Sequence, residues 1–321
     1  PGQTPLRVDQ FIIPVVAHLS RSTLQMAAQA GYVRVKGEPV KSNHKVKPAD
    51  VVTVELPQPV FEFELLPEPM DLDIVHEDDD LLVLNKPMNL VVHPGHGNFS
   101  GTLVNGVLHH IQGLPSLPGS PEQRPGLVHR LDKDTTGLMV LGKTERALTD
   151  LSGQFFERTV NRRYWALVWG DVLEDGTVTG HVGRSVRDRR VQQVYADGSE
   201  GKHAVTHYRV VERLGPVTLV ECKLETGRTH QIRVHMQSIG HPLFGDPTYG
   251  GNVAVKGAPG GKYNAFLRNM FAALPRQALH AKTLGFTHPT SGKRMDFQSE
   301  LPEDMAGVLS KWRTYVEAAS V

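Results

Sequence analysis

A short charged segment, residues 129–136, combines the side chains best suited to catalysis. It holds Asp132 close to Arg130, and its threonines can hydrogen-bond nearby backbone before the apolar stretch 137–141 begins. This pattern predicts a turn that opens into a buried strand, with Asp132 at the rim of a sheet. An aspartate kept ionised by an adjacent guanidinium can act as a nucleophile or a base. From local sequence alone, a carboxylate that merely caps the turn is the commoner explanation for Asp132 or Asp134.

Residues 226–235 combine two arginines with the start of a predicted helix. Thr229 can cap a helix that runs to about Ile239. Arg228 lies at its N-terminus, where the helix dipole favours an anion, and Arg233 lies on its polar face. Two arginines and a helix start near one place indicate a carboxylate partner or an RNA phosphate. A solvated polar face is the alternative.

Residues 161–170 place two arginines directly before an aromatic strand. This order is typical of phosphate contacts followed by a stacking surface for bases. Without further context, Tyr164, Trp165 and Trp169 are interpreted more simply as core aromatics.

Other classes of chemistry are disfavoured. Residues 137–144 match the spacing of a phosphate-binding P-loop, but the residues between the two glycines are large and apolar and read as a strand. His230 and His235 are five apart, which is not the spacing of a helical metal site. The only cysteine, Cys222, allows neither a disulfide framework nor a Cys-based zinc site. We therefore expect no metal and no cofactor.

Composition indicates an ordinary globular protein of two domains. The 321 residues are 39% hydrophobic, with no run long enough for a bilayer and no signal-peptide pattern at the start, which predicts a cytoplasmic location. The net charge of +1 is unevenly distributed. Residues 1–57 are basic, residues 58–80 hold nine acids and no base, and the rest is basic again. Basic segments suit a nucleic-acid partner, although charges scattered over a solvated surface give the same sum.

The pattern of elements predicts a small unit in residues 1–57, an acidic, Pro-rich linker in residues 58–73, and a larger mixed α+β domain in residues 74–321. In the small unit, a capping box at Ser22 opens a helix that Gly31 ends. A hairpin follows around residues 33–37, and another strand is predicted at residues 51–55. In the larger domain, apolar runs predict strands at Leu81–Leu84, Gly137–Leu141, Tyr164–Trp169 and Thr218–Leu224.

Taken together, these segments resemble the RluA-type pseudouridine synthase family. The catalytic motifs of the family are matched by His129-Arg130-Leu131-Asp132 with Thr135-Thr136-Gly137, by Arg163-Tyr164, and by Thr226–His235. The match continues through Asn85-Lys86-Pro87, Val91–Gly95, Gly240–Pro242, Gly245-Asp246, Tyr249-Gly250, Ala278–Ala281 and His288-Pro289. Residues 6–56 resemble an S4 RNA-binding domain through Arg7-Val8-Asp9, Ser20-Arg21-Ser22, Gly31, Val33 and Val35.

The resemblance implies a catalytic domain built on a mixed, mainly antiparallel sheet with flanking helices. It assigns Asp132 as nucleophile or base, Arg233 as its ion-pair partner, and Tyr164 as a ring near the uracil that later helps to remove a proton. Arg130 either fills the space left by the flipped base or contacts phosphate, and no cofactor is needed. The implied partner of this monomer is 23S ribosomal RNA or a large-subunit assembly intermediate. Further contacts with that RNA are expected from Arg228, Arg7, Arg21, Arg34, Lys36 and Lys41. The alternative is a non-catalytic RNA-binding factor for ribosome assembly.

Overall fold

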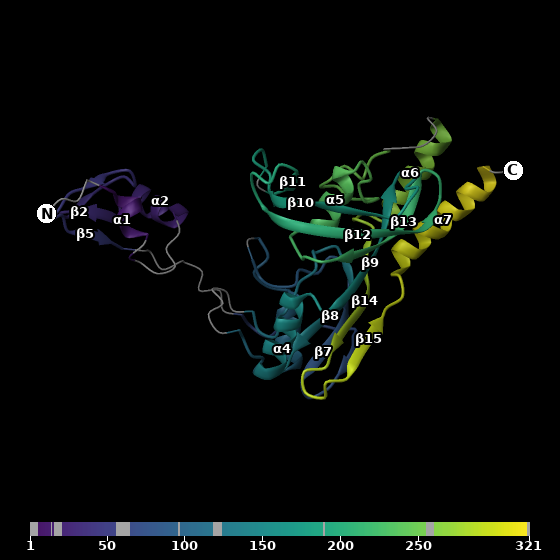
Figure 1. Cartoon of the computed structure of the whole chain (residues 1–321), viewed down its shortest axis with the longest axis horizontal. Helices are drawn as coiled ribbons and strands as arrows, with labels where there is room; N and C mark the ends of the chain where they lie inside the picture. The colour runs from purple at the N-terminus through teal and green to yellow at the C-terminus, as the bar shows by residue number, and fades with distance from the viewer. Residues whose placement is uncertain are drawn as a thin grey trace. The chain divides into compact units, whose positions relative to one another are not determined.

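The chain divides into two compact units, Pro1–Glu64 and Leu65–Val321 (Figure 1). The computed structural model describes residues 6–13, 15, 21–55, 65–95, 97–117, 124–188, 190–254 and 260–319. No helix in these ranges is long and apolar enough to cross a membrane. The domain limits expected from sequence, near residues 57 and 73, stay predictions. Residues 65–73 form no helix or strand, yet Leu65 and Leu72 pack against the core of the larger unit.

The first unit packs two helices against short strands. Val33 and Val35 point into a core shared with Leu24, whereas Arg34 between them points to the other face, as strand alternation requires. A positive φ at Gly31 lets the chain turn directly after the second helix. The elements of this unit are β1 (Leu6–Arg7), α1 (Val8–Ile12), α2 (Arg21–Gln29), β2 (Val33–Val35), β3 (Glu38–Pro39), β4 (Lys45–Val46) and β5 (Val52–Val54).

The second unit is built on a ten-stranded sheet in the order β11-β10-β12-β13-β9-β14-β8-β7-β6, with β15 paired to β14 beside this path. All pairings are antiparallel except that of β8 with β14, so the sheet is mixed and mainly antiparallel, as expected. The strands are β6 (Ile74–Glu77), β7 (Leu81–Lys86), β8 (Thr136–Gly142), β9 (Asn161–Trp169), β10 (Gly176–Arg184), β11 (Gln192–Tyr195), β12 (Lys202–Arg213), β13 (Val217–Leu224), β14 (Leu279–Thr287) and β15 (Arg294–Gln298). The helices are α3 (Leu103–His110), α4 (Glu145–Glu157), α5 (Gln231–Ser238), α6 (Gly261–Ala273) and α7 (Glu303–Ala319).

The sheet forks at β14. Along one edge β14 pairs with β9, while its other partners are β8 near its start and β15 from Thr283 onward. Gly137 makes the approach of β8 possible, because it has φ +115° and a Cβ there would lie 2.4 Å from the carbonyl oxygen of Ala281. The charged segment before β8 therefore opens beside β14, in the interior of the sheet.

Strand β9 is buried on both faces and separates two cores. Tyr164 and Ala166 face the core that also holds Ile232 of α5, whereas Leu167 and Trp169 face the core that α6 and α7 cover. In Figure 1, α6 and α7 lie beside β9 and β13 near the C-terminus. Trp169 is thus a core aromatic, and Tyr164 lies on the face toward α5.

Candidate active site

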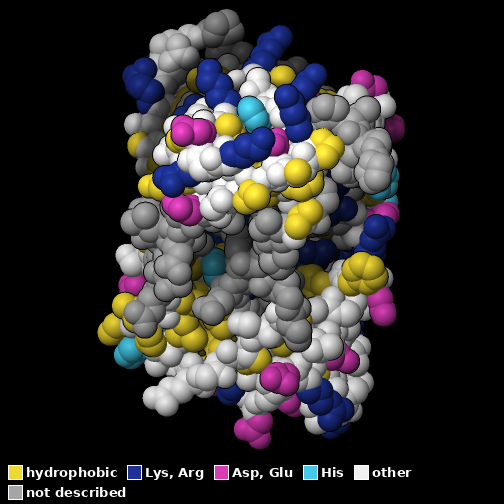
Figure 2. Space-filling model, turned by 90° about the vertical axis from the view of Figure 1, so that its left-hand side faces the viewer, with side chains coloured by type: hydrophobic (Ala, Val, Ile, Leu, Met, Phe, Trp, Pro, Cys, Tyr) yellow, Lys and Arg dark blue, Asp and Glu magenta, His cyan; other side chains and the backbone are white. Residues whose placement is uncertain are grey.

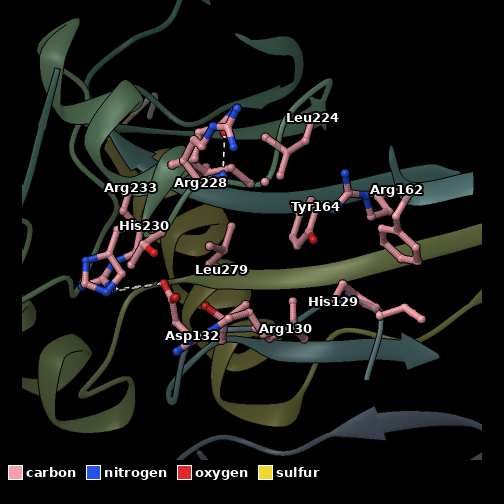
Figure 3. A pocket seen from close by; sticks show the side chains of 18 of the residues that line it. His129, Arg130, Asp132, Arg162, Tyr164, Leu224, Arg228, His230, Arg233 and Leu279 are labelled. Carbon is pink, nitrogen blue, oxygen red and sulfur yellow. Dashed lines mark hydrogen bonds and ion pairs between the residues drawn. The ribbon is translucent and has the colours of Figure 1, made fainter. Parts of the chain in front are cut away.

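A pocket of 340 Å³ opens where the segment before β8, the start of β9 and the start of α5 meet. Asp132, Tyr164 and Arg233 all line it, together with Arg130 and Arg228. Figure 3 shows Asp132, His230 and Arg233 at one end, with Tyr164 and Leu279 farther along the wall. The tertiary structure therefore brings together the three side chains that sequence reasoning singled out from distant segments.

Arg233 joins two carboxylates. Its Nη1 donates to Oδ2 of Asp132 at 3.2 Å, and its Nε and Nη2 donate to Asp246 at 2.7 and 2.9 Å. Burial alone lowers the pKa of Arg233, but the two carboxylates outweigh it and hold the pKa above its ordinary value. The guanidinium is therefore a permanent cation that faces the Asp132 carboxylate.

Asp132 is the accessible member of this group. Its side chain is 20% exposed, whereas that of Asp246 is fully buried. Oδ1 of Asp132 receives no hydrogen bond from the described residues, and its Oδ2 receives one. Asp246 by contrast also accepts from the backbone N–H groups of Thr248 and Tyr249. Asp246 is thus saturated as an acceptor, and Asp132 has the capacity to react.

The loop before α5 sets the position of Arg233. The side chain of Gln231 accepts hydrogen bonds from the Thr226 hydroxyl and the Arg228 backbone N–H at 2.7 and 3.0 Å. His230 has a left-handed backbone conformation, φ 54°, and the helix begins one residue later. The sequence pattern predicts Thr229 as the cap of this helix, but His230 occupies that position. The helix starts later because this loop folds back on Gln231.

Tyr164 forms part of the pocket wall, in register with Ala281 of β14. Its side chain is buried, and burial raises the pKa of the phenol. The nearby Arg162 opposes this rise, and the Asp132 carboxylate reinforces it. At neutral pH the hydroxyl therefore keeps its proton, and the ring offers an apolar face.

His230 and Tyr249 complete the surroundings of Asp132, and sequence reasoning assigned a role to neither. Nε2 of His230 lies 3.9 Å from Oδ2 of Asp132, and Nδ1 lies 3.0 Å from the Tyr249 hydroxyl. The Arg233 guanidinium stacks on the Tyr249 ring, 5.1 Å from its centroid. Burial lowers the pKa of His230, helped by Arg233 and opposed by Asp132, so the imidazole is neutral near pH 7.

A family model described as RNA pseudouridylate synthase matches residues 80–238. An uncharacterized RNA pseudouridine synthase of Chlorobaculum parvum is 46% identical to this chain over 99% of it and 97% of its own length. The chain belongs to the RNA pseudouridine synthase family. It is therefore an isomerase, as the resemblance of its motifs predicted.

Other relatives of the synthase carry narrower names. Ribosomal large subunit pseudouridine synthase D of Zymomonas mobilis is 44% identical, over 93% of this chain and 91% of its own. The protein of that name from Pseudomonas aeruginosa is 42% identical, over 97% and 93%. A solved structure, Human RNA Pseudouridylate Synthase Domain Containing 1, aligns with a TM-score of 0.52 at 26% identity, covering 77% of this chain and 97% of its own. The synthase therefore has the pseudouridine synthase fold.

Two buried basic side chains, Lys86 and Arg276, hold the backbone around Asp132, and sequence reasoning gave neither a role. Nζ of Lys86 donates to the carbonyl oxygens of Pro87, Leu90 and Lys133 at 2.8 to 2.9 Å. Nη1 of Arg276 donates to the carbonyl oxygen of Asp134 at 3.0 Å. Burial lowers the pKa of Lys86 to about 7, against the attraction of Asp134 and Asp132. The Asn-Lys-Pro motif was visible in the sequence, but its contact with Lys133, 47 residues away, was not.

The residues expected to bind RNA lie in both units of the synthase. Arg130 is exposed at the pocket, and Arg228 donates its Nε to the His203 carbonyl oxygen at 3.2 Å beside it. In the first unit, Arg7 pairs with Asp9, Lys36 with Asp50 at 3.0 Å, and Arg34 with Glu55 at 4.0 Å. Lys41 is exposed, and the side chain of Arg21 lies outside the described part. Their binding to RNA stays a prediction. In the described ranges, no group of three or more His, Cys, Asp or Glu side chains could hold a metal ion.

Proposed function

We propose that the synthase isomerises uridines to pseudouridines in 23S ribosomal RNA of the large subunit, acting as a cytoplasmic monomer without a cofactor. The support for this substrate is the name of the Zymomonas and Pseudomonas relatives, which are 42–44% identical over more than 90% of each chain. The observation that carries the catalytic assignment is the accessible Asp132 carboxylate held by Arg233 at 3.2 Å in a pocket of 340 Å³. This volume suits a small ligand such as one nucleoside.

In the proposed reaction the C1′–N1 bond of uridine breaks and a C1′–C5 bond forms. The proton lost from C5 is balanced by the proton gained at N1, so nothing is oxidised or reduced. Asp132 serves as nucleophile or base, and Arg233 holds its carboxylate in place inside the pocket. Tyr164 supplies the surface on which the uracil stacks, with the hydroxyl near the proton to be removed.

The pocket requires the uridine to leave its stack, because the reacting atoms cannot reach Asp132 from within a helix. Arg130 is exposed beside Asp132 and occupies the space that the flipped base leaves, or holds its phosphate. Arg228 contacts RNA backbone at the same rim. These roles complete a site that binds, extrudes and isomerises one nucleotide.

The first unit serves as an S4-like domain that docks on structured RNA, through Arg7, Arg21, Arg34, Lys36 and Lys41. Lys and Arg side chains are visible on the face in Figure 2, and residues 1–57 hold seven Lys and Arg against four Asp and Glu. Replacing Lys36 and Lys41 by glutamine is expected to weaken RNA binding and to flatten its dependence on salt by about one unit of slope per lost phosphate contact. Neutralising the exposed Lys311 of α7 is the matched control. An unchanged salt slope in the double variant contradicts this role.

Pseudouridine mapping of ribosomal RNA tests the proposal as a whole. Cells that lack the synthase are expected to lose pseudouridine at defined positions of 23S RNA, and the wild-type chain is expected to restore them. The Asp132→Asn variant is expected to bind RNA and restore none. Full restoration by that variant would refute the role of Asp132. An unchanged map in the deletion strain, with defective subunits rescued by the variant, favours the non-catalytic assembly factor instead.

A further inference from the structure

The active-site pocket has a second end that the proposed reaction does not use. In Figure 3, Asp132, His230 and Arg233 lie at one end, whereas His129 and Arg162 lie at the other. Two consecutive aromatics from the last turn of α4, Phe155 and Phe156, also line the pocket. This end therefore combines aromatic rings with a guanidinium, outside the reach of the catalytic carboxylate.

The two phenylalanines have opposite environments. Phe155 stacks on the His129 ring with 4.6 Å between centroids, and it packs against a buried core. Phe156 is 88% exposed, more than any other large hydrophobic side chain in the described part of the chain. Isolated apolar side chains on a surface are common, but this one borders a pocket that must receive RNA bases. Its exposure is consistent with a stacking surface that is open until substrate binds.

The end of α4 fixes where Phe156 points. Arg158 has a left-handed backbone conformation, φ 63°, and the backbone N–H of Thr159 donates to the Gln154 carbonyl oxygen at 3.0 Å. The chain then turns back through the buried Val160 into β9, where Tyr164 is also buried. Phe156 is thus held at the rim of the pocket by a closed helix end, and its backbone need not move for a base to stack on it.

Arg162 brings an uncompensated charge to the same end. Its guanidinium lies over the Phe155 ring, 5.0 Å from the centroid, and its charge opposes the rise in the pKa of Tyr164 that burial causes. Within the described ranges it has no carboxylate partner in an ion pair, and its Nε is buried without an acceptor. A phosphate is the anion that RNA offers to such a guanidinium.

We propose that this end of the pocket binds the nucleotide next to the target uridine, with its base stacked on Phe156 and a backbone phosphate at Arg162. The inference rests on the proposed function, because it identifies the pocket as an RNA site. Stacking on an aromatic ring tolerates every base. This subsite is therefore expected to prefer a purine, which stacks more strongly than a pyrimidine, without requiring one particular base.

Equilibrium binding of the full chain to a short single-stranded RNA, with one uridine between adenosines, tests the subsite. Stacking of about 1–3 kcal/mol per base predicts that Phe156→Ala raises the Kd roughly 5- to 150-fold, whereas Phe156→Tyr keeps it near wild type. The matched control is Leu173→Ala, which removes an exposed apolar side chain outside the pocket. An RNA that lacks the base next to the uridine, on one side only, is expected to bind the wild-type protein as weakly as the intact RNA binds the Phe156→Ala variant. For the Phe156→Ala variant, removal of that base is expected to leave the Kd unchanged.

Equal Kd values for Phe156→Ala and wild type overturn the subsite, as does an abasic penalty that is the same in both proteins. Isomerisation is measured separately, on 23S ribosomal RNA. If loss of the base and loss of Phe156 are non-additive in the Kd but no isomerisation occurs, the subsite stands and the proposed function fails. If isomerisation occurs but the two losses are additive, the proposed function stands and the subsite fails.

Discussion

Arg233 donates two hydrogen bonds to Asp246, at 2.7 and 2.9 Å, and only one to Asp132, at 3.2 Å. The fully buried carboxylate of Asp246 therefore fixes the position of the guanidinium. The partly exposed carboxylate of Asp132 accepts one further hydrogen bond from it. This division matters because a buried ion pair is costly to break, whereas a residue that must react needs free lone pairs. One arginine thus forms a fully buried pair with Asp246 and a partly exposed pair with Asp132, the proposed catalytic carboxylate.

This division predicts that replacing Asp246 mainly lowers stability, whereas replacing Asp132 mainly removes activity. Asp246→Ala leaves the buried Arg233 with only Asp132 to balance it, so the free energy of unfolding should fall by about 3–5 kcal/mol. Asp132→Asn should change it by less than about 1 kcal/mol, since the amide is isosteric and the site is partly exposed. Isomerisation should disappear in Asp132→Asn. Urea unfolding and a single-turnover assay measure the two effects, and equal destabilisation by both variants contradicts the division.

Lys86 is expected to position the catalytic segment without touching substrate. Lys86→Met leaves three carbonyl oxygens without their donor, which should lower the free energy of unfolding by about 1–3 kcal/mol. Because one of them belongs to Lys133, beside Asp132, kcat should fall while the Kd for RNA stays near wild type. The exposed Lys311→Met is the control. A rise in Kd with unchanged kcat would assign Lys86 to RNA binding instead.

The raised pKa of Tyr164 predicts a specific pH profile. Below pH 10, the ordinary pKa of the phenol, the hydroxyl stays protonated because burial moves its pKa still higher. The kcat of the wild type should therefore show no inflection from a phenol up to that pH. Tyr164→Phe keeps the stacking face, so KM should hold while kcat falls, roughly 100-fold if the hydroxyl helps to transfer the proton. A Tyr164→Phe variant with wild-type kcat excludes that part of the mechanism.

His280 should make stability sensitive to acid. Its imidazole hydrogen-bonds to the hydroxyls of Thr136 and Ser299, and burial lowers its pKa to about 4, helped by Lys282 and Arg276. In the unfolded chain His280 binds a proton near pH 6.5, but in the folded chain only near pH 4. The contribution of His280 to the free energy of unfolding is therefore fully present above pH 6.5 and is lost as the pH falls from 6.5 to about 4. The loss from this residue should approach about 3 kcal/mol.

Unfolding measured at several pH values checks this loss. His280→Asn should show a shallower fall of unfolding free energy below pH 6.5 than wild type, whereas His109→Gln, at an exposed position, should keep the wild-type slope. Parallel curves for His280→Asn and wild type would place the acid sensitivity elsewhere.

Gly137 is expected to be indispensable for the fork of the sheet. A Cβ there would meet the backbone of Ala281 at 2.4 Å, so Gly137→Ala should lower the free energy of unfolding by at least about 1–3 kcal/mol. Gly153 of α4 has nothing within 4 Å of its Cβ position, and Gly153→Ala should raise stability by roughly 0.5–1 kcal/mol. Thermal unfolding separates the two, and a tolerated Gly137→Ala would contradict the close approach of β8 and β14.

Local patterns predicted much of the fold. The apolar runs that indicated strands at residues 81–84, 137–141, 164–169 and 218–224 all lie within strands of the sheet. The start of α5 was placed too early, because the left-handed His230 and the hydrogen bonds of Gln231 depend on Thr226 and not on helix propensity. Propensity and periodicity report only neighbours in sequence, so a loop that folds back escapes them.

By itself, the sequence determined which segments carry chemistry, because a charged turn before an apolar strand, or an arginine on a polar helix face, is a local property. Local patterns alone favoured a turn cap for Asp132 and a core aromatic for Tyr164, and only the resemblance of the motifs to the family assigned these two residues and Arg233 to one reaction. Only the tertiary structure decided which groups surround them. The pair of Asp132 and Arg233 spans 101 residues, and the choice of Asp246 as the buried partner follows from the turn after α5. Such contacts arise from strand order and packing, which no local pattern encodes.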